Sequence, residues 1–378
     1  MINFNKSTAF SESIRYVFSL LSSHSISSNG KFTKECEKNL EDNFGYKKVL
    51  LTSSCTAALE ICAMITKKYC GEKNEIIMPS YTFVSSANSF AKFGFKIKFI
   101  DVKSDMNVDE KLVLNAISNR TAAVVTVNYG GFSSNLELLA KICKEREVFF
   151  IEDNAQGIDA KFKDQYLGTF GDFSTFSFHE TKNVTSGGEG GAFCCNNLNY
   201  IEDAKIIREK GTNREQFFCG IVDKYTWVGF GGHYLMSELQ SAFLLGQLEN
   251  LDKVTQRRRE IWQMYHHGLQ FLETQGVIEL QKESKDNVHN GHIFYLKCRD
   301  LNERSALITK LKQDGFGAVF HYIPLHESPA GQICGEFVGQ NVYTSRDSLR
   351  LLRLPIWFDL KDEDINRCIK SVVEFYEN

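Results

Sequence analysis

KVLLT at residues 48–52 and CTAALEICAMITKKYCG at residues 55–71 are the two adjacent stretches that decide the fold. The first is a short apolar run with the length of a buried strand, and the second has the composition of a buried helix. Gly71 suits the end of that helix, because glycine accepts the left-handed conformation common there. A buried strand that leads directly into a buried helix is the building unit of α/β folds.

The same alternation continues to about residue 200. Strands are predicted at 75–79, 95–101, 122–127 and 148–153, and helices at 84–93 and 136–145. Apolar strands separated by helices indicate a mostly parallel sheet that helices cover on both faces. The sequence therefore predicts an α/β fold.

The pattern changes in the last third of the chain. The elements predicted there are one long amphipathic helix or two in series over 244–265, a strand at 292–297, and helices at 303–313 and 363–376. We therefore predict a large domain over residues 1–250 and a smaller C-terminal α+β domain over residues 251–378.

The composition excludes several classes of protein. Lys plus Arg (44) against Asp plus Glu (47) leaves a net charge of −3, so nucleic acid is not an expected partner. No stretch reaches the ~20 apolar residues that cross a bilayer, and the first residues do not form a secretory signal. The eleven cysteines are scattered and mostly inside apolar runs. That is typical of reduced thiols in a cytoplasmic protein, and neither a membrane nor a metal is an expected partner.

Three groups of polar residues lie where predicted strands end, which is where open α/β sheets bind ligands. In the first, Ser54, Cys55, Thr56 and Ala57 form the start of a helix. Free N–H groups and hydroxyls at such a start can hold a phosphate. The alternative is that Ser54 simply caps the helix.

Asp153 is the second group, at the end of the apolar run VFFIED. A carboxylate after apolar strand residues is costly to bury unless a cation pairs with it, and a protonated ring nitrogen of a ligand would do so. The alternative is an Asp in a surface loop or at a helix cap.

Lys182 is the third group, in a turn that precedes the glycine-rich run 187–191. Glycines let the backbone approach a ligand closely, and a desolvated Lys can form a Schiff base. The alternative is a solvated Lys before a hairpin. A phosphate cradle, a strand-end Asp and a Lys together are what pyridoxal phosphate requires, because the Lys binds its aldehyde and the Asp keeps its ring nitrogen protonated.

The sequence resembles the fold-type-I, pyridoxal-phosphate-dependent sugar aminotransferases over nearly its whole length. The resemblance is carried by SCTAALE, EIIMPSYTFVSSANSF, IEDNAQG, GTFGDFSTFSFHETKN, GGEGGA and HYIPLH. It implies a large domain with a mostly parallel seven-stranded sheet flanked by helices, and a smaller C-terminal α+β domain. It also implies an active site between the subunits of at least a homodimer.

The resemblance also implies roles for individual residues. Lys182 would form the internal aldimine and move protons, Asp153 would pair with the pyridine nitrogen, and Gln156 would lie near the phenolic oxygen. The phosphate would be held by Thr56, Ala57 and Ser177. Phe83 would stack on the ring, with a core position as its alternative.

One segment departs from the family pattern. Many relatives have an Asn and an Arg in G-x-N-x-R-M, and here His233 and Leu235 take those places. His233 remains a candidate for the phosphate. Lys210, Arg214 and Lys224 are candidates for the donor's carboxylate or the sugar nucleotide, with a solvated surface charge as the alternative for each.

The segment HYIPLH at residues 321–326 is expected to close over the sugar or the cofactor. Tyr322 and His326 are candidates to hydrogen-bond hydroxyls or phosphate oxygens. Two His residues also suit a metal, but no carboxylate or Cys cluster accompanies them.

The branch of the family with the strongest resemblance makes dTDP-4-amino-4,6-dideoxygalactose for surface glycans such as enterobacterial common antigen. It implies transfer of the amino group of glutamate to C4 of a dTDP-4-keto-6-deoxyhexose. The alternatives are the gluco epimer, a 3-keto sugar, and a non-enzymatic cofactor-binding regulator. The related dehydratases carry His in place of Lys182, and no G-x-G-x-x-G favours a nicotinamide dehydrogenase.

Overall fold

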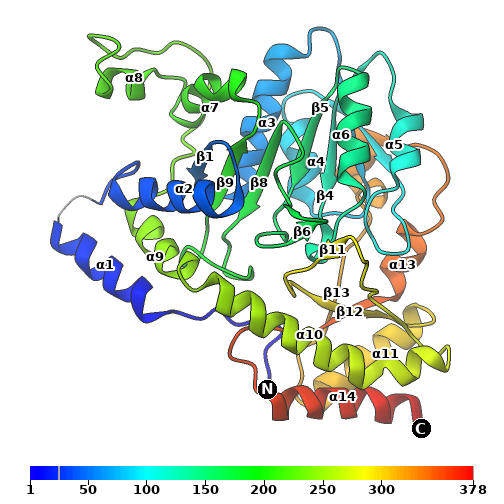
Figure 1. Ribbon diagram of the computed structural model, residues 1–378. Helices are drawn as coiled ribbons and strands as arrows, with labels where there is room; N and C mark the ends of the chain where they lie inside the picture. Colours follow the sequence, from blue (N-terminus) through cyan, green and yellow to red (C-terminus); the bar gives the residue numbers. More distant parts are fainter. Residues whose placement is uncertain (24–25, 378) are drawn as a thin grey trace.

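The structure, a computed structural model, describes residues 1–23 and 26–377 (Figure 1). Its centre is an eight-stranded sheet with the order β1-β9-β8-β5-β4-β2-β3-β14. The pairs from β8 to β14 are parallel, and β9 is antiparallel to both of its neighbours. The strands are β1 (Val49–Thr52), β2 (Glu75–Pro79), β3 (Lys96–Ile100), β4 (Thr121–Val127), β5 (Phe149–Asp153), β8 (Phe173–Ser177), β9 (Gly191–Cys195) and β14 (Gly335–Phe337).

The mostly parallel sheet and the strands expected at 75–79, 95–101, 122–127 and 148–153 are confirmed, with ends shifted by at most one residue. The resemblance implied a seven-stranded sheet, whereas the sheet has eight strands, seven of which come from the first 195 residues. The eighth, β14, comes from the C-terminal third of the chain and pairs with β3 at the edge. The three residues of β14 are too few to show a strand pattern in the sequence. They form a strand because they pair with β3.

Helices cover both faces of the sheet (Figure 1). Ile76 and Met78 of β2 pack in one cluster with α3 (Cys55–Tyr69) and α4 (Val84–Ala91). Ile77 points the other way, into a cluster with α5 (Glu110–Ala116) and α6 (Leu136–Glu145). Alternate strand residues therefore reach opposite faces, and both faces exclude water. The remaining helices of this part are α1 (Ser11–Ser23), α2 (Lys31–Phe44), α7 (Ile201–Arg208) and α8 (Arg214–Phe218).

Helix α3 begins and ends for local reasons. The Ser54 hydroxyl accepts a hydrogen bond of 3.1 Å from the Ala57 N–H, so Ser54 caps the helix. At the other end Cys70 is the cap residue, and Gly71 follows it with a φ of +60°. The helix ends slightly earlier than predicted, and the glycine accommodates the left-handed turn after it.

The long amphipathic stretch forms two helices in series, α9 (Glu238–Leu248) and α10 (Leu251–Thr274). A capping box of Ser237 and Gln240 starts α9. Helix α10 runs from the large sheet toward a four-stranded antiparallel sheet with the order β10-β12-β15-β13 (Figure 1). Those strands are β10 (Glu279–Leu280), β12 (Phe294–Lys297), β13 (Val319–Phe320) and β15 (Leu351–Leu354).

A second core lies between this sheet and helices α10, α11 (Leu301–Gln313) and α14 (Asp362–Glu377). Helix α12 (Pro329–Cys334) precedes β14, and a small sheet joins β6 (Lys161–Phe162), β7 (Gln165–Tyr166) and β11 (Asn287–Val288). The domain boundary near residue 250 stays a prediction. Two pieces of chain cross it, because β14 joins the large sheet and Ile2 hydrogen-bonds Gly315 and Gly317.

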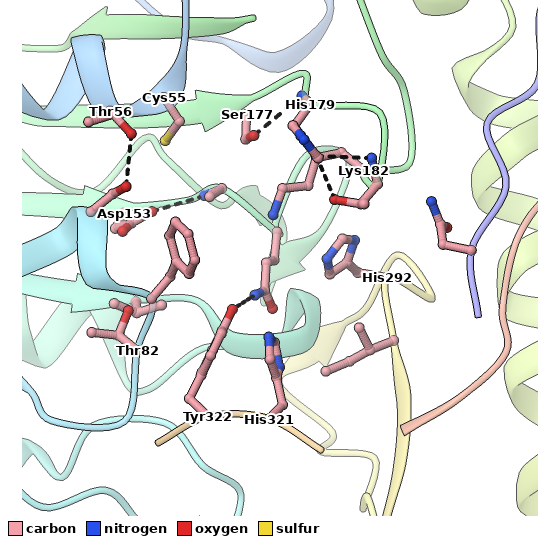
Figure 2. Close-up of a pocket in the computed structure, with 18 of the residues that line it drawn as sticks. Cys55, Thr56, Thr82, Asp153, Ser177, His179, Lys182, His292, His321 and Tyr322 are labelled. Atoms are coloured by element: carbon pink, nitrogen blue, oxygen red, sulfur yellow. Dashed lines mark hydrogen bonds between the residues drawn. The ribbon is translucent and has the colours of Figure 1, made fainter. Parts of the chain in front are cut away.

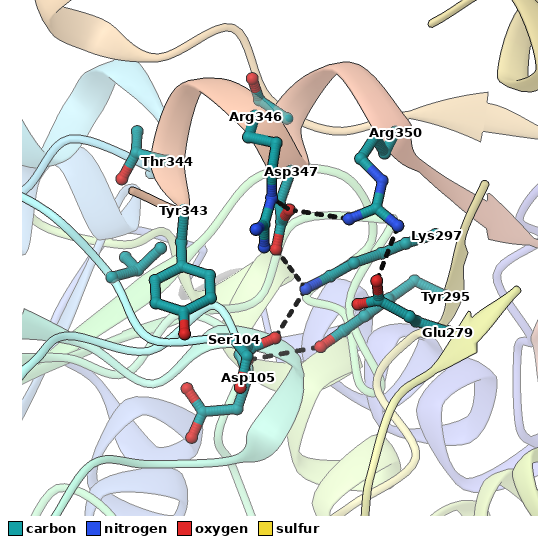
Figure 3. Close-up of polar contacts among 12 residues, drawn as sticks. Ser104, Asp105, Glu279, Tyr295, Lys297, Tyr343, Thr344, Arg346, Asp347 and Arg350 are labelled. Atoms are coloured by element: carbon teal, nitrogen blue, oxygen red, sulfur yellow. Dashed lines mark hydrogen bonds and ion pairs between the residues drawn. The ribbon is translucent and has the colours of Figure 1, made fainter. Parts of the chain in front are cut away.

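A buried ionic network ties the C-terminal sheet to the loop after β3 (Figure 3). Lys297 of β12 lies 2.6 Å from Asp347 of α13 (Thr344–Arg350), and its amine also donates to the Ser104 carbonyl at 2.6 Å. Both ionic side chains are almost completely buried. Asp101, at the end of β3, accepts the N–H groups of residues 342, 343 and 344. These bonds fix the position of one sheet relative to the other.

Candidate active site

A cavity of about 710 Å³ lies between the two sheets, at the carboxyl ends of β4, β5 and β8 and beside the start of α3 (Figure 2). This is where an open α/β sheet presents its ligand site. Of the residues predicted for the site, those that line the cavity are Thr56, Phe83, Asp153, Gln156, Ser177, Lys182 and Tyr322. The fold therefore brings together, at one cavity, residues as far apart in the chain as Thr56 and Tyr322.

Asp153, the last residue of β5, is 5% exposed. Its carboxylate accepts a hydrogen bond of 2.6 Å from the Ser86 hydroxyl and one of 3.3 Å from the Ala155 N–H. Burial raises its pKa. No basic side chain within the described ranges forms an ion pair with Asp153. A cationic group of a ligand bound in the cavity would therefore stabilise the charged form of its carboxylate.

Lys182 lies in the turn after β8, where its N–H donates to the His179 carbonyl at 2.9 Å. Its side chain is half-buried and lines the cavity. Burial lowers its pKa, while the charges of Cys55 and Asp153 act in the opposite direction. A Lys amine with a lowered pKa is more often neutral, which is the form that acts as a nucleophile and a base.

The start of α3 offers a polar end to the cavity. The Thr56 hydroxyl lies 2.8 Å from the Ser85 hydroxyl, and the Ser177 hydroxyl accepts a hydrogen bond of 3.4 Å from the His179 N–H. Ala57 does not line the cavity, and the Ser54 cap already uses its N–H. The hydroxyls of Thr56 and Ser177 thus fit a phosphate better than the Ala57 amide does.

Phe83 precedes α4 and is 56% exposed. The alternative of a core position for Phe83 is therefore wrong. Its ring centroid lies 6.3 Å from that of Tyr322. Tyr322 in turn receives a hydrogen bond of 3.2 Å from the Gln156 amide, whose oxygen accepts the Gly130 N–H at 2.7 Å. Gln156 is fixed from both ends, with its side chain at the cavity.

Two glycines of the glycine-rich run, Gly190 and Gly191, lie close against neighbouring protein groups. A Cβ on Gly191 would lie 2.4 Å from the Cys55 nitrogen, and a Cβ on Gly190 would lie 2.2 Å from the Ser186 hydroxyl. Gly191 therefore lets β9 approach the turn that starts α3. The close approach of the backbone to a ligand stays a prediction for Gly187 and Gly188, and no added Cβ on Gly188 would meet an atom within 4 Å.

Lys210, Arg214, Lys224 and His233 do not line this cavity. Arg214 is the first residue of α8, Lys210 precedes that helix in the chain, and Lys224 and His233 follow it. Helix α8 itself stands apart from the sheets (Figure 1). Arg214 forms a 2.6 Å ion pair with Glu209. Leu235, at the place of the family's Arg, is 7% exposed.

His326 also lies outside the lining of the cavity. Its Nδ1 atom lies 2.6 Å from the Ser80 hydroxyl, and its ring centroid lies 4.4 Å from that of Phe337. His326 thus ties the segment after Tyr322 to the end of β2, which makes it a packing residue here. The described part of the chain holds no cluster of His, Cys, Asp and Glu suited to a metal ion.

Among the lining residues to which the sequence analysis gave no role in binding the cofactor or substrate, three with ionisable side chains come from the C-terminal part: His292, His321 and Arg353. Burial lowers the pKa of both histidines well below the ordinary range, so both are neutral near pH 7. His292 contacts Asn183 at 2.9 Å, and His321 contacts the Tyr129 hydroxyl at 2.9 Å. A single Arg inside the apolar run LLRLP was the available signal for Arg353, because a charge in a buried strand needs a reason.

Residues 8–373 match the sequence profile of the DegT/DnrJ/EryC1/StrS aminotransferase family. The UDP-4-amino-4,6-dideoxy-N-acetyl-beta-L-altrosamine transaminase of Helicobacter pylori is 29% identical over 374 residues, 97% of this chain and 96% of that protein. The GDP-perosamine synthase of Escherichia coli O157:H7 is 27% identical over 367 residues, 96% and 95% of the two chains. Among solved structures, Helicobacter pylori PseC, an aminotransferase involved in pseudoaminic acid biosynthesis, has a TM-score of 0.91 at 25% identity, covering 100% of this chain and 99% of that chain.

The chain belongs to the DegT/DnrJ/EryC1/StrS aminotransferase family. It is a transaminase with the fold-type-I architecture, and its cofactor is pyridoxal phosphate. The cavity fits that group, because it holds a buried carboxylate without an ion-pair partner among the described residues, an amine with a lowered pKa, and the hydroxyls of Thr56 and Ser177. No helix within residues 1–23 and 26–377 is long and apolar enough to cross a membrane.

Proposed function

We propose that this aminotransferase moves the amino group of glutamate to C4 of dTDP-4-keto-6-deoxy-D-glucose. The product is dTDP-4-amino-4,6-dideoxy-D-galactose, used for surface glycans such as enterobacterial common antigen or O-antigen. The observation that carries the reaction type is that Lys182 and Asp153 line one cavity. The names of the relatives support a nucleotide-linked amino sugar, and the resemblance of the sequence blocks supports the dTDP sugar and the galacto product.

In the proposed reaction, Lys182 moves the proton. Its neutral Nζ takes a proton from the Cα atom of glutamate and, in the second half of the reaction, returns a proton to C4 of the sugar. Bound pyridoxal phosphate supplies an acceptor for the electron pair that the carbon keeps when it loses that proton. The lowered pKa of Lys182 favours the first transfer, because the amine must begin without its proton.

The other cavity residues are proposed to bind and orient the cofactor and the sugar. Asp153 would hold a proton on the ring nitrogen, and its burial would strengthen that contact because little water competes for the carboxylate. Thr56, Ser177 and Phe83 line the cavity, where the two hydroxyls would hold the phosphate and Phe83 would cover one face of the ring. Tyr322, kept in place by Gln156, points into the same space and is placed to contact a sugar hydroxyl (Figure 2).

We further propose that the working form is at least a homodimer. The segment around α8 exposes large apolar side chains, among them Phe218 at 68%, Ile221 at 71%, Trp227 at 68% and Phe230 at 79%. Contiguous exposed aromatics of this kind mark a contact surface. The same segment carries Lys210, Arg214, Lys224 and His233. In a dimer these residues would serve the cavity of the second copy. A cytoplasmic location stays a prediction from the sequence.

The test is a panel of purified keto sugars incubated with the protein, pyridoxal phosphate and glutamate, with the product identified by NMR. The panel contains dTDP-, UDP- and GDP-linked 4-keto-6-deoxy sugars and a dTDP-3-keto sugar. The proposal expects 2-oxoglutarate and the 4-amino galacto product from the dTDP-4-keto sugar. A gluco product, or a clear preference for another nucleotide or for the 3-keto sugar, would replace the proposed substrate. The absence of 2-oxoglutarate with every sugar would favour a cofactor-binding regulator.

A further inference from the structure

We propose that Arg353 binds the α-carboxylate of the amino donor. The inference rests on the proposed use of glutamate and deepens it by naming the residue that recognises the amino acid. Arg353 is the third residue of β15 and is half-buried, and it lines the same cavity as Lys182. Among the described residues that line the cavity, it is the only arginine.

The guanidinium of Arg353 is held by neutral contacts. It lies 4.5 Å from the centre of the Phe4 ring, and its Nη2 donates a long hydrogen bond of 3.5 Å to the Phe320 carbonyl. Its Nε is buried and has no hydrogen-bond partner, and no carboxylate in the described ranges lies within ion-pair distance. An arginine stays charged at any physiological pH, so Arg353 is a half-buried cation without a carboxylate partner among the described residues.

The cavity has few other cations to offer an anion. His292 and His321 are neutral, as their lowered pKa values show, and the charge of Arg353 contributes to that lowering in both. Lys182 is engaged with the cofactor. Arg353 is therefore the permanent positive charge of the cavity on the side of the C-terminal sheet.

The position of Arg353 relative to Lys182 selects the α-carboxylate from among the possible anions. Arg353 and Lys182 line the same cavity, and the positive charge of Arg353 contributes to the lowered pKa of Lys182. In an amino acid, the α-carboxylate is bonded to the carbon that gives its proton to Lys182. In a nucleotide sugar, the whole sugar ring separates the diphosphate from C4. The cofactor phosphate has its own cradle at Thr56 and Ser177.

Many relatives carry an arginine in the segment G-x-N-x-R-M, and this chain has none there. Arg353 provides a positive charge in the cavity from another part of the same chain. Leu235 takes that place and is buried. The basic residues considered in the sequence, Lys210 and Arg214 among them, lie outside the cavity of this chain. A planar guanidinium also suits a carboxylate, because it can donate two parallel hydrogen bonds.

The test measures the two half-reactions separately in the cofactor-loaded protein. Arg353→Gln is compared with Arg353→Lys and with Arg299→Gln, which removes an exposed arginine that does not line the cavity. Glutamate is mixed with the pyridoxal phosphate form, and the dTDP-4-keto sugar with the pyridoxamine phosphate form, and the absorption of the bound cofactor is followed. Arg353→Gln is expected to raise the apparent Kd for glutamate roughly 10- to 100-fold while the sugar half-reaction changes less than about twofold.

Two further readouts separate recognition from a structural effect. The wild type is expected to prefer glutamate to its α-amide, and Arg353→Gln is expected to lose that preference. Arg353→Lys keeps the charge but not the paired hydrogen bonds, so it is expected to show a smaller rise in Kd than Arg353→Gln. The pH at which the absorption of the bound cofactor titrates should move upward in Arg353→Gln, because a nearby positive charge is gone. Arg299→Gln should match the wild type throughout.

Three results would overturn the assignment: an unchanged Kd for glutamate, an equal loss in both half-reactions, or a loss confined to the keto sugar. The last result would assign Arg353 to the diphosphate. A wild type that reacts with glutamate but with no keto sugar would contradict the proposed sugar substrate and leave the role of Arg353 measurable. A wild type that reacts with no glutamate would contradict the proposed donor.

Discussion

Asp153 and Lys182 line one cavity, and the charge of each offsets part of the effect that burial has on the other. Burial raises the pKa of Asp153 and lowers that of Lys182, so burial disfavours the charged form of each. A cofactor whose ring nitrogen carries a proton restores the charge of Asp153. The same cofactor uses the neutral amine of Lys182. Asp153 and Lys182 together therefore suit a ligand that has both a protonated ring nitrogen and a group that reacts with a neutral amine.

Replacing Asp153 by Asn should lower turnover roughly 10- to 100-fold, because a hydrogen bond to a charged group is lost where electrons are withdrawn. Cofactor attachment to Lys182 should persist, so the loss should appear in the rate of each half-reaction and not in cofactor content. Asp164→Asn changes an exposed carboxylate and is the control. Equal turnover in Asp153→Asn and the wild type would remove Asp153 from the reaction.

Gly191→Ala should weaken cofactor binding without touching a group that contacts the cofactor. The added carbon would lie 2.4 Å from the Cys55 nitrogen, which forces β9 away from the start of α3. Such overpacking costs about 1–3 kcal/mol of stability. Gly229→Ala is the control, since its added carbon meets only Ile206, at 3.7 Å. Thermal unfolding and a cofactor titration measure both effects, and a Gly191→Ala protein that matches Gly229→Ala in both would contradict the packing role.

Stability should fall in acid partly through Asp347. Burial alone would raise the pKa of Asp347, but the hydrogen bond from Arg346 and the charge of Lys297 outweigh burial and hold it below its ordinary value of 3.8. A lowered carboxyl pKa stabilises the fold above the unfolded-state pKa, and that stability is lost as the pH falls through the folded-state pKa. Asp347→Asn should therefore unfold more easily at pH 7 and lose less stability on further acidification than the wild type.

The loss of stability expected for Asp347→Asn is large because the ion pair of Asp347 with Lys297 is buried. Removing one partner leaves Lys297 buried and unpaired, which costs on the order of 3–5 kcal/mol. Asp42→Asn, at an exposed position of α2, should behave as the wild type. Urea unfolding between pH 3 and pH 7 measures the difference, and parallel pH curves for Asp347→Asn and the wild type would contradict the role assigned to this network.

The apolar segment around α8 should govern assembly. Trp227→Ser together with Phe230→Ser removes two of its most exposed aromatic side chains and is expected to shift the protein from dimer to monomer. Phe271→Ser, which removes an exposed aromatic on α10, is the control. Sedimentation analysis measures the state of assembly. A monomeric wild type with full activity would contradict the proposed dimer.

Local sequence patterns were enough to predict most of the large sheet and part of the site. Asp153 and Ser177 end buried strands, and Thr56 starts a helix, so the general geometry of α/β sheets brings them together. Lys182 follows in the turn after the strand that ends at Ser177. Each of these residues lies at the end of a strand, at the start of a helix or in the turn after a strand. Such positions can be recognised from the local sequence.

Contacts between distant parts of the chain could not be predicted in this way. Arg353 and His292 reach the cavity only because the C-terminal sheet packs across the carboxyl ends of the large sheet. His326 was expected to face a ligand, but it is turned toward Ser80, a residue 246 positions away in the chain. Lys210, Arg214 and Lys224 lie on a segment whose neighbours in the working form belong, in our proposal, to a second copy.

The most direct test of the central claim is to reduce the cofactor-loaded protein with borohydride and to locate the modified residue by mass spectrometry. Lys182→Ala serves as the variant and Lys210→Ala as the matched control. We predict one pyridoxyl group on Lys182 in the wild type and in Lys210→Ala, and no such group and no turnover in Lys182→Ala. A pyridoxyl group on another lysine, or visible absorption and turnover retained in Lys182→Ala, would contradict the account.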